Sequence, residues 1–309
     1  MKKVILMIVG TLLVLASLGL VLYPFISNFL MGLNQQAEVS AYQDFIDNTD
    51  EKTISKALSD AREYNKSLYG HVIITDPFDP NFRPVFDKEY HSLLNLKGDG
   101  VMGYVDIPAI DVLLPIYHGT SDYVLAKGAG HLQNTSLPVG GVGTHAVITG
   151  HTGLSTARLF TDINQLKARK TENGATEKGD VFLIHVLDET LAYEVDQIKV
   201  VEPKETDDLK IDVNEDYVTL VTCTPYGINS HCLLVRGTRV PYTPEQKEEV
   251  SAIERVVEST WMLEYKKALF AGFILLTVLI ILIIVIRLLV RRHKRRAAAH
   301  KPPAEESSQ

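Results

Sequence analysis

The two cysteines of the chain, Cys223 and Cys232, lie nine positions apart in the stretch TLVTCTPYGINSHC. Apolar runs lead into the first cysteine and follow the second, and a Pro/Gly turn lies between them. This strand–turn–strand pattern permits a disulfide across a hairpin. It equally permits a reactive thiol, because the end of a strand holds a nucleophile rigidly while the loop leaves room for a substrate. Spacing and composition leave the two alternatives open.

A nucleophilic cysteine needs a base or a cation beside it, because only the thiolate attacks. His145 and His151 lie at the two ends of the short run HAVITGH. His151 precedes a glycine-containing turn, so it is a candidate general acid and base. A lone histidine is more often structural, and His118, His131 and His231 are weaker candidates. The sequence has no zinc-ligand spacing and no glycine-rich phosphate loop, so we expect no metal site.

The elements that would position these residues are mostly strands. From Gly103 onward, short segments rich in β-branched residues are bounded by Gly, Pro, Asp and Asn, which is typical of an all-β barrel or sandwich. They are GYVDIPAIDVLLPIYHG, HAVITGH, DVFLIHVLDETLAYEVDQIKVVEP, DYVTLVTC and CLLVRGTRVPY. Apolar residues at helical spacing predict one helix at residues 156–169. The next stretch, KTENGATEKGD, is predicted to be a polar loop.

Helices are predicted on both sides of this β region. Residues 38–69 carry apolar residues at helical spacing, and NTDEKT indicates a cap and a break between two helices. Residues 71–87 contain three prolines and several aspartates, which indicates an irregular loop. After Tyr242, TPEQKEEVSAIERVVESTWMLEYKK begins with a capping signal and is predicted to be a helix.

Two long uncharged runs predict membrane-spanning helices. Residues 4–37 and 268–286 carry no charged side chain, and about 20 apolar residues suffice to cross a bilayer. Basic residues flank them in MKK and RLLVRRHKRR, so the positive-inside rule places both termini in the cytoplasm and the segment between them outside the cell. The first run could instead be a cleaved signal peptide, but its length favours a retained anchor.

The composition narrows the range of partners. The chain has 309 residues, a formal net charge of −7 and 46% hydrophobic residues. The predicted external segment shows no basic excess, so nucleic acid is not expected as a partner. An extracellular compartment permits disulfides, which keeps the pairing of the two cysteines open.

Several stretches resemble, in the same order, the motifs of the class C, pilus-assembling sortases of Gram-positive bacteria. They are LPIYHGTSDYVLAKGAGHLQNTSLPVGGVGTHAVITGHTGL, LFTDI and TLVTCTPYGINSH followed by LLVRG. The resemblance implies a mostly β fold, an eight-stranded sortase β-barrel with N-terminal helices, flanked by two transmembrane helices. It also implies a membrane-anchored cysteine transpeptidase without a cofactor. Such an enzyme cleaves Leu-Pro-x-Thr-Gly-like sorting signals and joins pilin subunits through a lysine amine.

The resemblance assigns roles to residues and segments. Cys223 matches the family's nucleophile and His151 its catalytic histidine, which leaves His145 structural. Asp76 and Phe78 resemble the lid that plugs the family's active site. The expected segments are a signal anchor at 1–37, a helical region with the lid loop at 38–102, the catalytic barrel at 103–245, a linker helix with the second transmembrane helix at 246–290, and a basic, disordered cytoplasmic tail at 291–309.

The chain departs from the family at one functional position. The family's active-site arginine follows the nucleophile by nine positions, and Cys232 stands there. Arg236 lies about 13 Å further along an extended strand, and the family has an arginine at that position as well, so Arg236 is not expected to replace the missing one. We therefore expect either a working transpeptidase or a low-activity or inactive sortase-fold protein that binds pilins. A hydrolytic cysteine protease is the weakest alternative.

Overall fold

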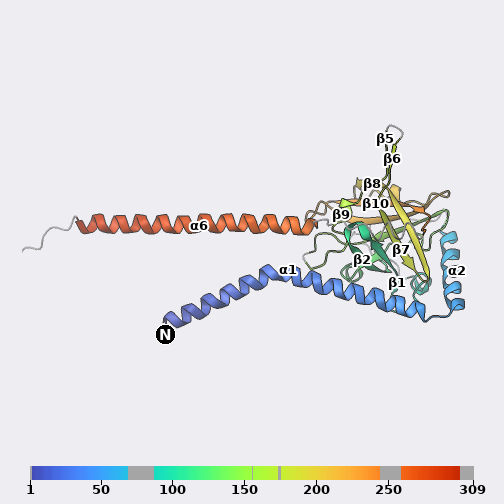
Figure 1. The fold of residues 1–309 in the computed structure, drawn as a ribbon, viewed down its shortest axis with the longest axis horizontal. Coiled ribbons are helices and arrows are strands. Elements are labelled where there is room, and N and C mark those ends of the chain that lie inside the picture. The colour runs from blue at the N-terminus through green and yellow to red at the C-terminus, as the bar shows by residue number, and fades with distance from the viewer. Residues whose placement is uncertain (1, 69–86, 155, 173–174, 244–258, 300–309) are drawn as a thin grey trace, which may run out of the picture. The chain divides into compact units, whose positions relative to one another are not determined.

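The computed structural model describes residues 2–68, 87–154, 156–172, 175–243 and 259–299. The chain divides into two compact units, Met1–Trp261 and Met262–Gln309. The first unit contains a closed β-barrel with helices, and the second contains most of one long helix (Figure 1). The candidate chemistry lies entirely in the first unit.

Eight strands close the barrel, in the spatial order β1-β2-β3-β4-β9-β10-β8-β7. Their bounds are β1 Val101–Ile107, β2 Val112–His118, β3 Ala129–His131, β4 Thr144–Thr149, β7 Val181–Val186, β8 Glu189–Val201, β9 Asp216–Thr224 and β10 His231–Val240. The eight-stranded barrel confirms the predicted fold class. Most neighbouring strands are antiparallel, but β2 and β3 pair in parallel, and so do β4 and β9.

Alternate residues along these strands belong to two apolar clusters on opposite faces of the barrel wall. Ile148 of β4, Leu220 of β9 and Val235 of β10 belong to the main core. The residues next to them face the other way and form a second cluster, here called the outer cluster. It consists of Leu132, Val147, Val201, Leu209, Val221, Cys232 and Leu234. One cysteine of the opening stretch is therefore part of a packed apolar surface.

Short elements connect the strands. Two are single α-helical turns, α3 Lys88–Ser92 and α4 Asp122–Leu125. Three are 3-10 turns, η1 Pro108–Ile110, η2 Ile163–Gln165 and η3 Asp207–Leu209. The last of these supplies Leu209, so the connection from β8 to β9 covers the outer cluster.

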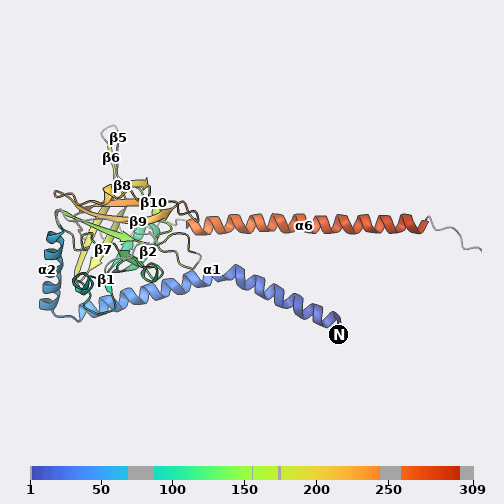
Figure 2. The ribbon, with the colours of Figure 1, turned by 180° about the vertical axis from the view of Figure 1, so that it is seen from behind.

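Two helices precede the barrel, and the predicted break between them is confirmed. α1 spans Lys2–Asp47 and α2 spans Glu51–Ser67, with α2 turning off the end of α1 (Figure 2). Asp50 caps α2, because its carboxylate accepts the N–H of Thr53 at 3.0 Å. The end of α1 packs on the barrel through Tyr42, whose buried hydroxyl donates to the Met102 carbonyl at 3.1 Å and accepts the Leu187 N–H at 2.8 Å.

Two of the helices are long and apolar enough to cross a membrane. They are α1 and α6, which spans Thr260–Ala299. None of the most apolar window of either helix is buried within the protein. A soluble core helix would bury such a surface, so these helices match the two spans that the sequence predicted.

The helix predicted at residues 156–169 is wrong. Turns and η2 occupy this segment. Leu159 adopts the left-handed conformation with a φ of 43°, which the interior of an α-helix excludes. The N–H of Phe160 bonds the carbonyl of His151 at 3.1 Å instead of a helical partner. The helical spacing of apolar residues arises because Phe160 and Ile163 are core residues of a turn.

The polar loop predicted at KTENGATEKGD is wrong as well. Most of it is a hairpin of β5, Lys170–Glu172, and β6, Ala175–Glu177, which projects from the barrel (Figure 1). The intervening sequence is Asn-Gly, the strongest short hairpin signal, and the loop interpretation overlooked it. The strand β3 was not predicted, because its three residues give no periodicity. The helix predicted after Tyr242 falls mostly on residues 244–258, which lie outside the described residues.

Two buried histidines make the stability of the barrel sensitive to acid. Burial lowers the pKa of both His131 and His145 to about 4. Unfolding would restore values near 6.5, so the unfolded chain binds more protons between these two pH values. The contribution of these neutral histidines to the free energy of unfolding is therefore fully present above pH 6.5. It is lost as the pH falls toward 4, by up to about 3 kcal/mol for each histidine.

We expect the thermal midpoint of the barrel to fall between pH 7 and pH 4.5, and to fall less in a His145→Gln variant, which does not titrate. The chain would be held in detergent, and near-ultraviolet circular dichroism would follow the loss of tertiary structure. Equal pH dependence in the two proteins would contradict the role given to His145.

Candidate active site

Cys223 occupies the penultimate position of β9, where the strand meets a turn. The side chain is half-buried. The turn closes through the carbonyl of Pro225, which accepts the N–H groups of Ile228 at 3.0 Å and Asn229 at 2.9 Å. Gly227 has a φ of 74°, which favours glycine at this point of the turn. Rigid backbone therefore holds the thiol at the edge of the sheet.

The parallel pairing of β4 with β9 brings His151 to the same strand end. The register is constant from Thr144 opposite Asp216 to Thr149 opposite Val221. It continues past the strand, because the N–H of Gly150 bonds the carbonyl of Val221 at 3.0 Å. His151 follows Thr149 by two residues and Cys223 follows Val221 by two residues, so the two positions lie at the same end of this strand pair.

Two further residues fix this approach, and the sequence analysis missed both. The hydroxyl of Thr222 donates to the carbonyl of Gly150 at 2.7 Å. The ring of Phe160 lies so close to Gly150 that a Cβ there would meet it at 2.6 Å. Only glycine is tolerated at this contact, and the backbone just before His151 is held from both sides. Gly150 and Thr222 lie next to His151 and Cys223 in the sequence motifs, but their contacts are with residues distant in sequence, so the motifs alone do not show what they do.

The electrostatics of His151 favour the neutral imidazole. Burial lowers the pKa of His151, and the carboxylate of Asp122 opposes that shift only in part. A neutral imidazole at pH 7 can accept the proton of a thiol and can later return a proton to a leaving amine. The pair of residues is therefore chemically suited to nucleophilic acyl transfer.

Cys232 lies directly opposite Cys223 on the neighbouring strand β10. The carbonyl of Val221 points to β4. Residues two apart in a strand direct their backbone N–H and C=O groups to the same side, so those of Cys223 also point to β4 and away from β10. The two cysteines therefore form a non-hydrogen-bonded cross-strand pair. Both are thiols in the structure. The side chain of Cys232 is only 4% exposed and belongs to the outer cluster.

Arg236 is engaged elsewhere. Its guanidinium forms a bidentate ion pair with Asp196, with the Nε–Oδ1 distance at 3.0 Å and the second nitrogen–Oδ2 distance at 2.9 Å. It also lies over the ring of Tyr217, 4.2 Å from the centroid. These contacts hold the cation four residues along β10 from Cys232. The structure thus agrees with the expectation that Arg236 does not replace an arginine at position 232.

The other candidate histidines are placed away from the thiol or on the other face. His145 is buried, with its Nδ1 atom 2.9 Å from the Lys210 carbonyl and its Nε2 atom 2.7 Å from the Thr219 hydroxyl, so its role is structural. His131 and His118 are buried in hydrogen bonds near Tyr90. His231 is paired with Thr224 and points to the opposite face from Cys232.

Asp76 and Phe78, the predicted lid residues, lie outside the described residues. Among the described residues, no group of three or more His, Cys, Asp or Glu side chains could hold a metal ion. The candidate site therefore comprises the thiol of Cys223 near the end of β9 and the imidazole of His151 just after β4, with the thiol of Cys232 on β10.

Comparisons with known proteins identify the family of the barrel. The family model described as the sortase domain matches residues 105–240. The crystal structure of sortase C-1 from Streptococcus pneumoniae is 46% identical, with a TM-score of 0.60, and the match covers 67% of this chain and 100% of that chain. A second sortase C structure from Streptococcus pneumoniae is 43% identical, with a TM-score of 0.58 over 67% of this chain and 98% of that one. Its description concerns catalysis and pilin substrate specificity.

A curated relative is more distant. Sortase A of Bacillus anthracis is 28% identical over 140 residues, which are 45% of this chain, and the match spans 60% of the length of that relative. The class C structures therefore share far more of this chain than the curated relative does.

The lowered pKa of His151 can be measured directly. We expect its imidazole to titrate below pH 6.5, so that the ring is neutral at pH 7 and gains its proton only as the pH falls. Nuclear magnetic resonance of the ¹⁵N-labelled imidazoles gives this value, with the His151 signals assigned by their loss in a His151→Gln variant. A midpoint above pH 6.5 would show that a negative charge near the ring outweighs its burial.

Proposed function

Since this chain belongs to the sortase family, we propose that it is a membrane-anchored cysteine transpeptidase that joins pilin subunits. The observation that supports the proposal is the β4–β9 register, which runs to Thr149 opposite Val221 and so leads His151 and Cys223 to the same end of the strand pair. A thiol and a histidine so placed can share a proton, which acyl transfer requires.

In the first proposed step, the sorting signal of a pilin is cleaved. His151 takes the proton of Cys223, and the thiolate attacks the carbonyl of the Thr–Gly bond in a Leu-Pro-x-Thr-Gly-like signal. A C–S bond forms as the C–N bond breaks, and His151 returns the proton to the departing glycine amine. The product is a thioacyl enzyme.

In the second step, a lysine amine of another pilin attacks the thioester. His151 accepts a proton from the amine, a new C–N bond forms and the C–S bond breaks, which regenerates Cys223. One amide is exchanged for another, so the proposed reaction needs neither ATP nor a cofactor.

The relatives and the two apolar helices support the partners we propose. The sortase C of Streptococcus pneumoniae whose description concerns pilin substrate specificity is 43% identical to this chain. Pilins with sorting signals are accordingly the proposed substrates, and nucleic acid is not a proposed partner. Anchoring enzyme and substrate in one membrane would raise their effective concentration. α1 and α6 would supply that anchor.

Cys232 favours a second candidate, a sortase-fold protein with little turnover that binds pilins. The family's arginine binds the substrate and stabilises the developing oxyanion, and losing one such donor costs about 3–4 kcal/mol, or about 10²–10³-fold in rate. A buried thiol is a weak donor. Arg236 is held by Asp196 and cannot take over without breaking that ion pair.

The cysteine pair offers another reason for low activity, which is a disulfide. Non-hydrogen-bonded partners in antiparallel strands have Cα atoms about 4.5 Å apart, and disulfides span Cα distances of about 4.4–6.8 Å. The register of Cys223 and Cys232 is therefore compatible with oxidation, which would remove the nucleophile until a reductant restored it.

Substitutions at the two catalytic positions and at position 232 test the function. Cys223→Ala and His151→Ala should each abolish transfer of a sorting-signal peptide to an added amine, because the two residues act as one unit. Cys232→Arg should raise the rate by about 10²-fold or more. Each protein would be assayed by mass spectrometry of its products.

Reductant and a Cys232→Ala variant serve as controls in the same assay. Rescue by alanine equal to that by arginine, or rescue by reductant alone, indicates a disulfide rather than a missing cation. Turnover that is equal in all position-232 variants contradicts the role assigned to that position. Binding without turnover supports the second candidate, and acid as the sole product indicates a hydrolase.

Topology is tested separately. With both termini in the cytoplasm and the barrel outside, protease added to intact wall-stripped cells should digest the barrel and spare a tag placed after Gln309. We expect this orientation because basic residues lie beyond each apolar run, and such residues remain on the cytoplasmic side of the membrane. A tag lost at the same rate as the barrel would exclude this arrangement, and lysed cells provide the control for protease access.

A further inference from the structure

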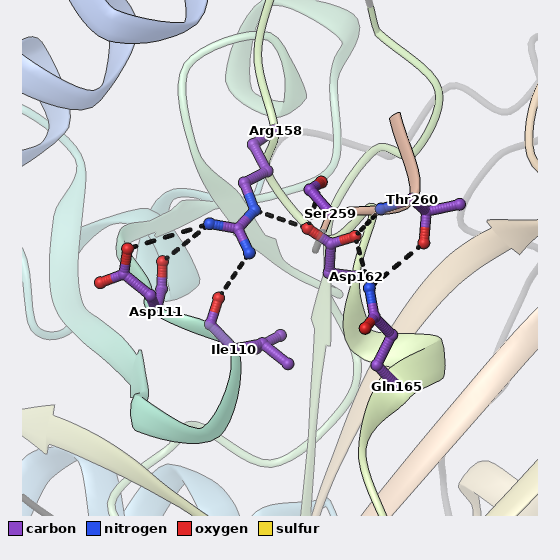
Figure 3. Close-up of polar contacts among 7 residues, drawn as sticks. All are labelled: Ile110, Asp111, Arg158, Asp162, Gln165, Ser259 and Thr260. Carbon is purple, nitrogen blue, oxygen red and sulfur yellow. Dashed lines mark hydrogen bonds and ion pairs between the residues drawn. The ribbon is translucent and has the colours of Figure 1, made fainter. Parts of the chain in front are cut away.

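Asp162 is a fully buried carboxylate that the chemistry above does not use. Its Oδ2 atom accepts the Nε–H of Arg158 at 2.5 Å, and its Oδ1 atom accepts the amide of Gln165 at 3.0 Å (Figure 3). Arg158 in turn donates to the carbonyl of Ile110 at 2.7 Å. These contacts tie the turn at residues 158–163 to the barrel.

The same carboxylate binds a segment almost a hundred residues away in the sequence. The hydroxyl of Ser259 donates to Oδ2 at 2.6 Å and the N–H of Thr260 donates to Oδ1 at 2.7 Å. Thr260 is the first residue of α6, so Asp162 satisfies a backbone donor that the helix itself leaves open. Burial alone would raise the pKa of Asp162, but the bonds from Ser259, Arg158 and Thr260 lower it.

A ring contact supports the placement of this segment. Trp261 lies against Phe25 of α1, with centroids 5.4 Å apart in an edge-to-face arrangement. Ser27, two residues along α1, donates to the carbonyl of Thr156 at 3.2 Å. Ser27, in the first apolar run, and residues 259–260, which precede the second, thus bond residues of the stretch that follows His151.

The turn that carries Asp162 also holds the backbone of His151. The N–H of Phe160 bonds the His151 carbonyl at 3.1 Å, and the Phe160 ring packs against Gly150. Within the turn, the N–H of Thr161 bonds the Arg158 carbonyl at 2.9 Å. A shift of Asp162 therefore moves Phe160, which lies between it and the histidine.

We propose that Asp162 is a positioning residue for His151, and that residues 259–261, at the start of α6, are part of the active-site architecture. The segment would hold the turn at residues 158–163 in place, and the turn would hold the imidazole level with Cys223. The proposal rests on the proposed function for its effect on turnover. The docking itself is a property of the fold.

Two substitutions disturb the contact from opposite sides. Asp162→Asn keeps the shape but removes the charge that Arg158, Ser259 and Thr260 bind. Ser259→Asp leaves the barrel intact and places a second carboxylate against Asp162, so it repels the segment. Asp216→Asn is the matched control, because this half-buried carboxylate also accepts a backbone N–H and a hydroxyl, from Gly141 and Tyr193, but lies at the opposite end of β9.

The full chain in detergent is assayed with a sorting-signal peptide and by hydrogen exchange. We expect Asp162→Asn and Ser259→Asp to lower kcat about tenfold, because misplaced catalytic groups lose rate steeply, and to leave KM nearly unchanged. The backbone amides of residues 158–163 should exchange faster in both variants, and the titration midpoint of His151 should move. Asp216→Asn should change none of these.

Two results overturn the proposal. One is a Ser259→Asp protein with the exchange rates and kcat of the parent chain, which would show that the segment is not coupled to the turn. The other is an equal loss in Asp216→Asn, which would show general destabilisation. If the parent chain itself has no turnover, the proposed function fails, and the exchange rates and the His151 titration still decide the coupling.

Discussion

The parallel pairing of β4 with β9 is the constraint on which the site depends. Its last bond, from Gly150 to Val221, continues the register beyond β4 and brings positions 151 and 223 to the same end of the strand pair. A one-residue slip would send one side chain to the other face of the sheet. The bond from Thr222 and the ring of Phe160 hold the same backbone, so stability and proposed catalysis rest on the same few contacts.

The strand β10 carries the position at which this chain is expected to differ from the family. Cys232 lies on β10 at the position where the resemblance predicts an arginine, and it is buried in the outer cluster. The surroundings of Cys232 are therefore apolar, and Arg236 supplies no cation there, because Asp196 holds it further along the strand. The pairing that aligns Cys232 with Cys223 also brings two thiols within the range of a disulfide. The strand pairing can therefore align Cys223 for attack even where a missing cation or a disulfide lowers the activity.

The barrel could be predicted because its signals are local, and the proposed catalytic pair came from local motifs as well. Strand residues alternate, and the motifs around His151 and Cys223 resemble those of a family. The segment at residues 156–169 misled the periodicity argument, since Phe160 is buried by Gly150, a contact with no helical counterpart. The contacts of Asp162 could not be predicted from sequence either, because its partners Ser259 and Thr260 lie almost a hundred residues further along the chain. Long-range partners of this kind leave no pattern in the chain.

The proposed account is tested most directly by intact-mass spectrometry of the reduced protein after brief exposure to a Leu-Pro-x-Thr-Gly peptide. It predicts an added mass equal to the peptide up to its threonine, and fragmentation should locate the thioester on Cys223. The adduct should disappear when an amine is added. Either of two results would contradict it: a thioester on Cys232, or release of the cleaved peptide by the unsubstituted protein with no adduct detected.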